Sequence, residues 1–260
     1  MLIIPNILYK VNIFYKILFK IYVKIQTIVR TIVHNINVKE NFEVQKMNYK
    51  KAVVEAGIRM SDSNLTVETW GNISIRDPET GLVYLTPSAM NYYDCTEDDV
   101  VVCDLDGNIV EGNRKPTVEK DLHLMIYKNR PNINSVVHTH PIYSMVFACL
   151  GREIPQVIDE AAQIFGDVVR VAEYGLPGSK ELAENCIKAL GTTSNACLLQ
   201  SHGAVCLGTD LEKAFKVAKV LEMTAQIYHM CLTIGTPYKI SDENIATMLD
   251  FAQNHYGQNK

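Results

Sequence analysis

The sequence predicts a single α/β domain built in layers around a mixed β-sheet. From residue 47 onward, short apolar runs typical of strands alternate with segments whose apolar residues recur at helical spacing. Tight turns join the early strands, while longer helical segments separate the later ones, so hairpins and crossovers are expected in one sheet. We see no internal repeat and no linker in residues 47–260, which indicates one domain.

The first helix and the early strands follow from local pattern. Apolar and small residues recur at helical spacing in residues 47–60. A turn over residues 77–81 and an Asp-Gly pair at Asp106 are hairpin signals. The strands that flank these turns are residues 72–76, 82–86, 100–104 and 109–111.

The later elements alternate between helices and strands. Thr117 is a possible N-cap for a helix over residues 117–128. An apolar run over residues 135–139 predicts a buried strand, and a helix is expected to start near Pro141. The remaining predicted strands are residues 168–172 and 196–200, and the remaining helices are residues 178–190, 210–234 and 241–255.

Composition narrows the class of protein. The chain has 260 residues, of which 47% are hydrophobic and 21% charged, as in an ordinary globular protein. Its net charge of −4 gives no bias toward nucleic acid, which we do not expect as a partner. The seven cysteines are an odd number and never stand at CxxC spacing, so we expect reduced thiols in or near the core and a cytoplasmic location.

Residues 1–46 differ from the rest of the chain. They are rich in Ile, Lys, Asn, Tyr and Val, and the first acidic residue is Glu40. Lysines interrupt every apolar run, so no run is long enough for a transmembrane helix. One interpretation is a basic amphipathic helix on a membrane surface, and another is a non-native leader before a true start at Met47. We favour the leader, and expect membrane association only if residues 1–46 are native.

Three histidines form a candidate metal site. His138 and His140 are two positions apart in a strand, so their side chains share one face and can bind one ion. Two hydrogen-bonded histidines at a strand end are the competing interpretation of that pair. His202 stands at another strand exit, where it would add a third nitrogen. Three histidines with a fourth position open are typical of catalytic zinc.

Glu119 and several turn segments are candidate partners of this site. Glu119 and His123 lie four residues apart and share a face of the expected helix. A carboxylate at this place can also cap the helix, which is the competing interpretation. Small polar residues in turns and at a helix N-terminus can bind a phosphate, although they are also common turn residues. These candidates are Gly71, Asn72, Ser88, Ala89 and Thr117.

Taken together, these motifs resemble the class II aldolase and adducin family, over essentially all of residues 47–260. The likeness is strongest to the branch that cleaves L-fuculose 1-phosphate. The shared markers stand in the family's order: Gly71-Asn72-Ile73-Ser74, Thr86-Pro87-Ser88, Glu119 with His123, His138-Thr139-His140, Gln200-Ser201-His202-Gly203 and Leu211-Glu212-Lys213-Ala214. The tail from Ser241 to Gly257 also looks like that branch.

The resemblance implies a three-layer α/β/α domain with a central, largely antiparallel sheet. It also implies a homotetramer with active sites at subunit interfaces and one Zn²⁺ per subunit. The implied metal ligands are His138, His140, His202 and Glu119. The implied phosphate contacts are the turn residues named above, and Tyr256 would reach into a neighbouring active site.

The implied reaction breaks a carbon–carbon bond. Glu119 stands where the epimerases of the family usually carry aspartate, so this chain sides with the aldolases. We therefore expect a zinc-dependent lyase that cleaves a ketose 1-phosphate, L-fuculose 1-phosphate or a similar sugar, to dihydroxyacetone phosphate and an aldehyde. Glu119 would move the proton at C3.

Two departures from the family pattern leave part of the site open. Val118 stands where the family has a second small hydroxyl residue, so its backbone amide would have to replace that phosphate contact. Asp159 stands where the family places a tyrosine from the adjacent subunit. The proton donor to the leaving aldehyde is then Asp159, Glu160 or Tyr256, and the aldehyde half of the substrate stays open.

Two alternatives remain. The first is an aldolase or dehydratase acting on a 5-deoxy- or methylthio-pentulose 1-phosphate, which is motivated by Glu160 in place of an aromatic residue. The second is an adducin-like interaction module that keeps the fold without catalysis. Such modules are expected to lose metal ligands, whereas this chain keeps all three histidines.

Overall fold

The computed structural model describes residues 21, 24–30, 47–256 and 258. Before Met47 it describes only residues 21 and 24–30, which are helical and expose their side chains. The rest of the N-terminal extension lies outside the described residues, so the choice between a leader and an amphipathic segment stays a prediction. No helix in the described ranges is long and apolar enough to cross a membrane.

An eight-stranded sheet forms the middle layer of the domain, in the order β4-β3-β2-β1-β5-β8-β7-β6. Neighbouring strands are antiparallel except β6 and β7, which are parallel. The strands are β1 (Asn72–Arg76), β2 (Val83–Leu85), β3 (Val101–Cys103), β4 (Ile109–Glu111), β5 (Ser135–Thr139), β6 (Val171–Ala172), β7 (Ala196–Leu199) and β8 (Gly203–Gly208). The expectation of a largely antiparallel sheet is confirmed.

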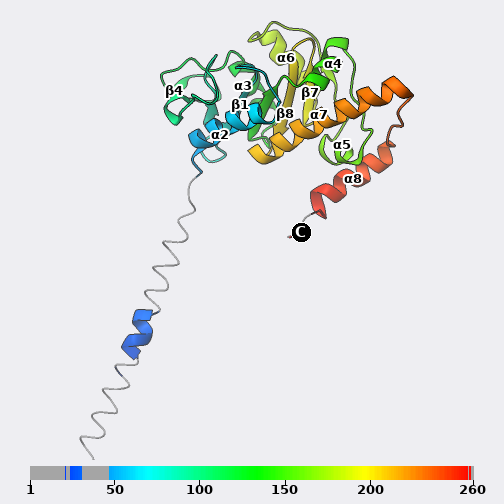
Figure 1. The fold of residues 1–260 in the computed structure, drawn as a ribbon. Coiled ribbons are helices and arrows are strands. Elements are labelled where there is room, and N and C mark those ends of the chain that lie inside the picture. Colours follow the sequence, from blue (N-terminus) through cyan, green and yellow to red (C-terminus); the bar gives the residue numbers. More distant parts are fainter. Residues whose placement is uncertain (1–20, 22–23, 31–46, 257, 259–260) are drawn as a thin grey trace, which may run out of the picture. The chain divides into compact units, whose positions relative to one another are not determined.

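Helices cover both faces of the sheet, which makes three layers (Figure 1). The helices are α2 (Tyr49–Asp62), α3 (Lys120–Asn129), α4 (Ile142–Leu150), α5 (Asp159–Ile164), α6 (Lys180–Leu190), α7 (Leu211–Ile234) and α8 (Asp242–Asn254), and Glu97–Asp99 is a 3₁₀ turn. Residues of α2, α4, α5 and α7 share one buried cluster, and residues of α3 and α6 share the other. Val136 and Val137 of β5 fall in different clusters because successive side chains of a strand point to opposite faces.

Two elements were not expected from the sequence. Strand β8 begins and ends with glycine, so its start looked like a continuation of the turn after Gln200. Helix α5 has six residues, too few for a helical repeat to show. The predicted strand over residues 168–172 is shorter than expected, because only Val171 and Ala172 pair with β7.

The start of α3 corrects one expectation. Thr117 is not the N-cap; the helix begins at Lys120, and Glu119 occupies the N-cap position. Thr117 instead accepts a hydrogen bond on its hydroxyl from the backbone N–H of Glu119, at 3.3 Å. This arrangement places Glu119 at the end of the helix that faces the centre of the sheet.

The cysteines are all free thiols. Five of them are buried, as expected for core residues, while Cys149 is exposed and Cys231 is half-buried. Burial raises the pKa of the Cys95 and Cys103 thiols to about 11. These buried thiols are therefore protonated and unreactive at neutral pH.

Candidate metal centre and active site

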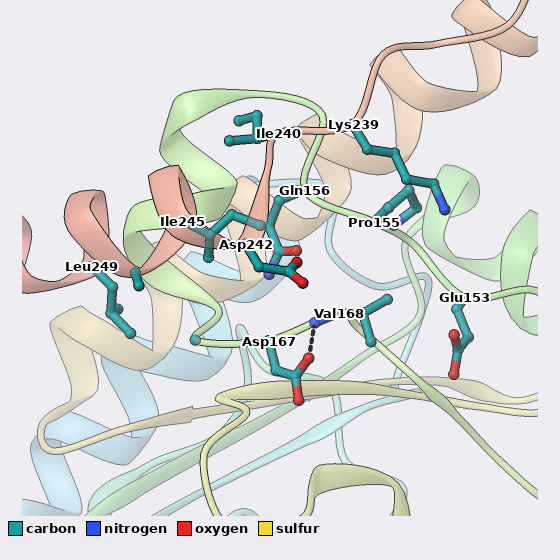
Figure 2. A pocket seen from close by; sticks show the side chains of 12 residues that line it. Glu153, Pro155, Gln156, Asp167, Val168, Lys239, Ile240, Asp242, Ile245 and Leu249 are labelled. Carbon is teal, nitrogen blue, oxygen red and sulfur yellow. Dashed lines mark hydrogen bonds between the residues drawn. The ribbon is translucent and has the colours of Figure 1, made fainter.

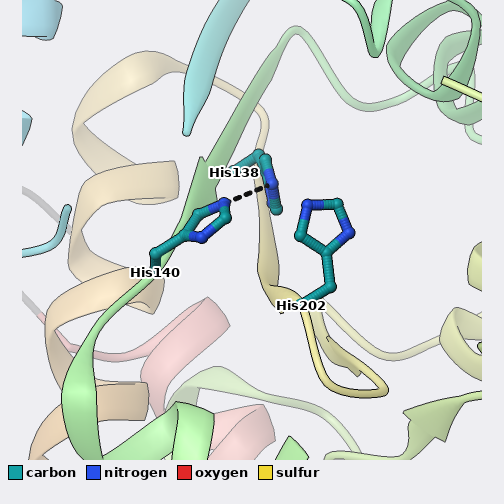
Figure 3. A group of neighbouring side chains, drawn as sticks. All are labelled: His138, His140 and His202. Atoms are coloured by element: carbon teal, nitrogen blue, oxygen red, sulfur yellow. Dashed lines mark hydrogen bonds between the residues drawn. The ribbon is translucent and has the colours of Figure 1, made fainter. Parts of the chain in front are cut away.

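The ends of two neighbouring strands bring the three histidines together. His138 lies in β5, His140 follows its end, and His202 lies in the turn between β7 and β8. Their ligand atoms all lie within 4.8 Å of one another, and Figure 3 shows the rings turned toward a common centre. The ring centroids are separated by 4.7, 4.9 and 5.1 Å. The sequence prediction that these residues form one cluster is confirmed.

Two glycines allow the strands to approach so closely. Gly71 has a φ of +77°, and a Cβ there would lie 2.7 Å from the carbonyl oxygen of His138. A Cβ on Gly203 would lie 2.5 Å from the carbonyl oxygen of Thr139 and 3.0 Å from the His138 ring. Any side chain at either position would push apart the backbone that supports the histidines.

The hydrogen bond of His138 fixes which ring nitrogen faces the cluster. Its Nδ1 lies 2.9 Å from the carbonyl oxygen of Ala204, which can only accept, so Nδ1 carries the proton. Its Nε2 then faces Nε2 of His140 at 3.0 Å. A backbone carbonyl that orients a histidine in this way is typical of metal sites.

Glu119 turns its carboxylate into the cluster instead of capping α3. No side-chain capping bond forms at this helix start. Oε2 lies 3.0 Å from Nε2 of His138, and Oε1 lies 3.3 Å from Nε2 of His202. The side-chain amide of Asn72 donates to Oε2 at 2.8 Å. The capping interpretation of Glu119 is therefore wrong.

Burial and mutual charge set the protonation of these groups. Burial works to raise the pKa of Glu119, but His138, His202 and Asn72 outweigh it and hold the pKa below the usual range. Burial, together with His138, lowers the pKa of His140 to about 3 and that of His202 to about 4. Burial also works to lower the pKa of His138, but the Glu119 carboxylate raises it overall. The ionised carboxylate of Glu119 therefore lies beside the neutral rings of His140 and His202. It also increases the tendency of the His138 ring to hold a proton.

The donor set fits a divalent metal ion. Oε1 of Glu119 and Nδ1 of His202 are buried and have no hydrogen-bond partner within the described chain. Buried polar atoms without partners are rare, and a cation in the cluster would satisfy the carboxylate oxygen. Three imidazoles and a carboxylate are ligands that suit zinc, which binds histidine nitrogen and carboxylate oxygen.

The three predicted phosphate-binding elements are neighbours in the fold. Thr86 donates its backbone N–H to Ile73 and accepts from the N–H of Thr117, both at 3.1 Å. Ser88 donates its N–H to Lys115 at 2.9 Å, which joins the same two segments. Ala89 is exposed with a φ of +52°. A phosphate role for these residues stays a prediction, and their proximity supports it.

The remaining predicted phosphate contacts differ in how far they are exposed to solvent. Asn72 and Thr117 are buried, and the amide of Asn72 already contacts Glu119 and His123. Val118 is 62% exposed beside Thr117, so it can present only an apolar side chain and its backbone to a ligand.

The residues predicted to handle the aldehyde are exposed on this chain. Asp159 and Glu160 form the exposed first turn of α5. Tyr256 is 60% exposed and lines a hollow of about 590 Å³ near Lys216 of α7. No contact between the described residues joins any of these three side chains to the histidines. The described residues of one chain therefore show no direct contact between this predicted group and the histidines.

A second hollow lies beneath α8, apart from the histidines. It has a volume of about 520 Å³, and Figure 2 shows Gln156, Asp167 and Asp242 around it. Gln156 is buried, and its side-chain nitrogen has no partner among the described residues. None of the predicted site residues lines this hollow.

Sequence reasoning missed the polar side chains behind Glu119. Ser74 and Tyr127 join His123 and Asn72 in a buried chain of hydrogen bonds. Polar residues at alternate positions of β1, with a spacing of four in α3, were the available signal. That signal becomes specific only when the pairing of β1 with α3 is known.

Comparison with known proteins identifies relatives that match most of this chain. A family profile described as "Class II Aldolase and Adducin N-terminal domain" matches residues 51–229. A 5-deoxy-D-ribulose 1-phosphate aldolase of Bacillus thuringiensis is 38% identical, covering 80% of this chain and 97% of that protein. An L-fuculose phosphate aldolase of Escherichia coli is 33% identical, covering 77% of this chain and 92% of that protein.

A solved structure shares the fold of this chain. A structure of L-fuculose 1-phosphate aldolase superposes with a TM-score of 0.77 at 35% identity, covering 80% of this chain and 97% of that chain. The similarity therefore spans nearly the whole length of each of these relatives.

Proposed function

Since this chain belongs to the class II aldolase and adducin family, we propose that it is a metal-dependent lyase that cleaves a ketose 1-phosphate to dihydroxyacetone phosphate and an aldehyde. Aldolase relatives match along nearly their full length, which supports a sugar-phosphate aldolase. The single observation that carries the proposal is the ionised Glu119 carboxylate held within 3.3 Å of two of three clustered histidines.

The metal that we propose is Zn²⁺, one per subunit, held by His138, His140 and His202 with Glu119 beside them. When bound, the ion supplies Lewis acidity that polarises the ketose carbonyl. The unpartnered Oε1 of Glu119 and the neutral state of His140 and His202 support this ligand set. Neutral imidazoles have a free lone pair, which metal binding requires.

Glu119 is the group that we expect to move the proton at C3. In the direction of synthesis, its ionised carboxylate removes that proton from dihydroxyacetone phosphate. In cleavage, the same group returns a proton to C3 after the C3–C4 bond breaks. A buried carboxylate without water competitors, fixed by Asn72, suits a repeated transfer at one carbon.

The phosphate and the leaving aldehyde use different parts of the protein. Asn72, Ser88, Ala89 and Thr117, with the backbone at Gly71 and Val118, would hold the phosphate as a remote handle that positions the reacting bond. The C4 hydroxyl loses its proton as the aldehyde leaves. We assign that proton to Tyr256, Asp159 or Glu160 of a neighbouring copy, because these side chains are exposed and make no contact with the histidines among the described residues. A homotetramer with interface active sites is therefore part of the proposal.

We favour a 5-deoxypentulose 1-phosphate as the substrate. The relative described as a 5-deoxy-D-ribulose 1-phosphate aldolase matches at 38% identity across 97% of its length. The acidic pair Asp159 and Glu160, in the place of an aromatic residue of the fuculose branch, also favours a different aldehyde. L-fuculose 1-phosphate is the second candidate, since the solved L-fuculose 1-phosphate aldolase superposes at a TM-score of 0.77.

A coupled assay for dihydroxyacetone phosphate tests this proposal. The zinc-loaded protein is offered 5-deoxyribulose 1-phosphate and, separately, L-fuculose 1-phosphate. We expect release from the first at a kcat/KM at least tenfold higher, and loss of both activities after dialysis against a chelator. Release from the second alone would favour the second candidate. Release from neither, with zinc bound, would contradict the aldolase proposal.

A further inference from the structure

A continuous chain of hydrogen bonds runs from the interior of the domain to Glu119. The hydroxyl of Tyr127 lies 2.7 Å from Oγ of Ser74, which lies 2.6 Å from Nδ1 of His123. Nε2 of His123 lies 2.6 Å from Oδ1 of Asn72. Nδ2 of Asn72 then donates to Oε2 of Glu119 at 2.8 Å. All five side chains are at most 6% exposed, so water does not compete for these bonds.

Helix α3 and strand β1 place these five side chains next to one another. Glu119, His123 and Tyr127 are four residues apart and lie on one face at the start and along the length of α3. Asn72 and Ser74 are two apart on β1 and point to that same side of the sheet. Asn72 also pairs with His138 across the strands, so the network lies directly behind the metal cluster.

The direction of the protons follows from the end of the chain. The Glu119 carboxylate can only accept, so Asn72 must present its NH₂ group to it and its oxygen to His123. His123 must then donate from Nε2, which leaves Nδ1 to accept from Ser74. Burial lowers the pKa of His123 to about 3, consistent with this neutral form. If His123 did not donate, the Asn72 amide could flip and turn its oxygen toward the carboxylate.

We propose that His123 is a positioning residue for Glu119: it fixes the orientation of the Asn72 amide, and that amide holds the carboxylate at the metal centre. Asn72 uses one of its two N–H bonds on Glu119, and the second remains for a substrate oxygen. The same amide thereby links ligand binding to the placement of the acid/base. This inference deepens the proposed function and rests on it for its catalytic meaning.

A purely structural role for His123 makes a different prediction. In that case its loss would lower stability without any specific effect on Glu119. A positioning role predicts that the effect acts through Glu119 and disappears when the carboxylate is absent. A double-mutant cycle separates the two, because only coupled residues show effects that fail to add.

The experiment measures zinc affinity by chelator competition, which does not depend on turnover. His123→Leu removes both hydrogen bonds, and His123→Gln restores a donor toward Asn72. We expect His123→Leu to weaken zinc binding 10- to 100-fold, as is typical of residues behind metal ligands, and His123→Gln to recover most of the loss. In a Glu119→Gln background, His123→Leu should change zinc affinity less than threefold.

Two further variants keep the test interpretable. Ser74→Ala removes the donor to His123 and should weaken zinc binding by about three- to tenfold, even if His123→Leu fails to fold. Tyr228→Phe is the matched control, because it removes a buried hydroxyl that contacts Arg152 and lies outside the network. It should leave zinc affinity unchanged.

Two results would overturn the inference: wild-type zinc affinity in the folded His123→Leu and Ser74→Ala variants, or an equal loss in both Glu119 backgrounds. If the wild-type protein releases no dihydroxyacetone phosphate from either sugar, the proposed function fails while the zinc measurement still decides the role of His123. If the protein is an aldolase, the same variants should lower kcat and, because the Asn72 amide also faces the substrate, raise the KM for the sugar phosphate.

Discussion

Two regions of this molecule were assigned to one active site, and they differ in how completely a single chain builds them. At the histidine end of the sheet, β1, β5, α3 and the β7–β8 turn bring every predicted metal ligand within contact distance. In the second region, which comprises α5 and the residues after α8 and is called the C-terminal region below, Asp159, Glu160 and Tyr256 are exposed and have no described contact with that cluster. Packing in the interior fixes the side chains of the first region, whereas the side chains of the second region are exposed on this chain.

This difference indicates how the two halves of the reaction are divided. Binding a cation and moving the C3 proton require groups fixed to better than an ångström, and the buried ends of the central strands hold them in place. The group that takes the C4 hydroxyl proton in cleavage, and returns it in synthesis, can come from a neighbouring copy, where specificity can vary without changing the metal site. Changes at the histidine end should therefore abolish chemistry, while changes in the C-terminal region should alter the aldehyde that is accepted.

The largest expected effect is at Glu119. Glu119→Gln keeps the shape and the contact with Asn72 but cannot take a proton, so kcat should fall about 100- to 10,000-fold. Three histidines remain, so zinc should still bind. Steady-state kinetics and metal content by elemental analysis measure the two outcomes. A variant that keeps more than a tenth of wild-type kcat would contradict the acid/base role.

The histidine end could be predicted from sequence because its signals are local. Two histidines two apart in an apolar strand define a shared face, and His202 stands at a similar strand exit. The network behind Glu119 could not be predicted, because Ser74 and Tyr127 are far apart in sequence and meet only through the packing of β1 against α3. Strand β8 was missed because Gly203, which lets its start approach the histidines, also resembles a continuation of the turn after Gln200.

Subunit mixing tests the second region directly. Tyr256→Phe should lower kcat about 10- to 100-fold if its hydroxyl serves a site in another copy. Mixing Tyr256→Phe with Glu119→Gln after reversible dissociation should then restore activity, because about a quarter of randomly formed sites combine an intact residue from each copy. Activity that stays at the average of the two separate variants would show that Tyr256 does not act across subunits.

The neutral state of His123 predicts a pH dependence of stability. Burial lowers its pKa from 6.5 to about 3 in the folded protein, whereas the unfolded chain binds the proton near 6.5. This group's contribution to stability is therefore complete above pH 6.5 and is lost as the pH falls toward 3. Between pH 6.5 and 5 the metal-free protein should lose about 2 kcal/mol from this residue.

Denaturant unfolding of the metal-free protein at those two pH values measures that loss. His123→Gln should lack it, because glutamine does not titrate, while His140 and His202 contribute equally to both proteins. Equal losses in the two proteins would mean that His123 is protonated, or accessible to water, in the folded state.

The smallest expected effect is at Val118. This residue is 62% exposed beside Thr117 at the start of α3, where a hydroxyl would meet a phosphate bound by the neighbouring turns. Val118→Ser should lower the KM for the phosphorylated substrate about three- to tenfold, the worth of one added hydrogen bond, with kcat unchanged within twofold. Val110→Ser, at an equally exposed valine of β4, should leave both constants unchanged. An unchanged KM in Val118→Ser would move the phosphate away from the start of α3 and separate it from the histidine end of the sheet.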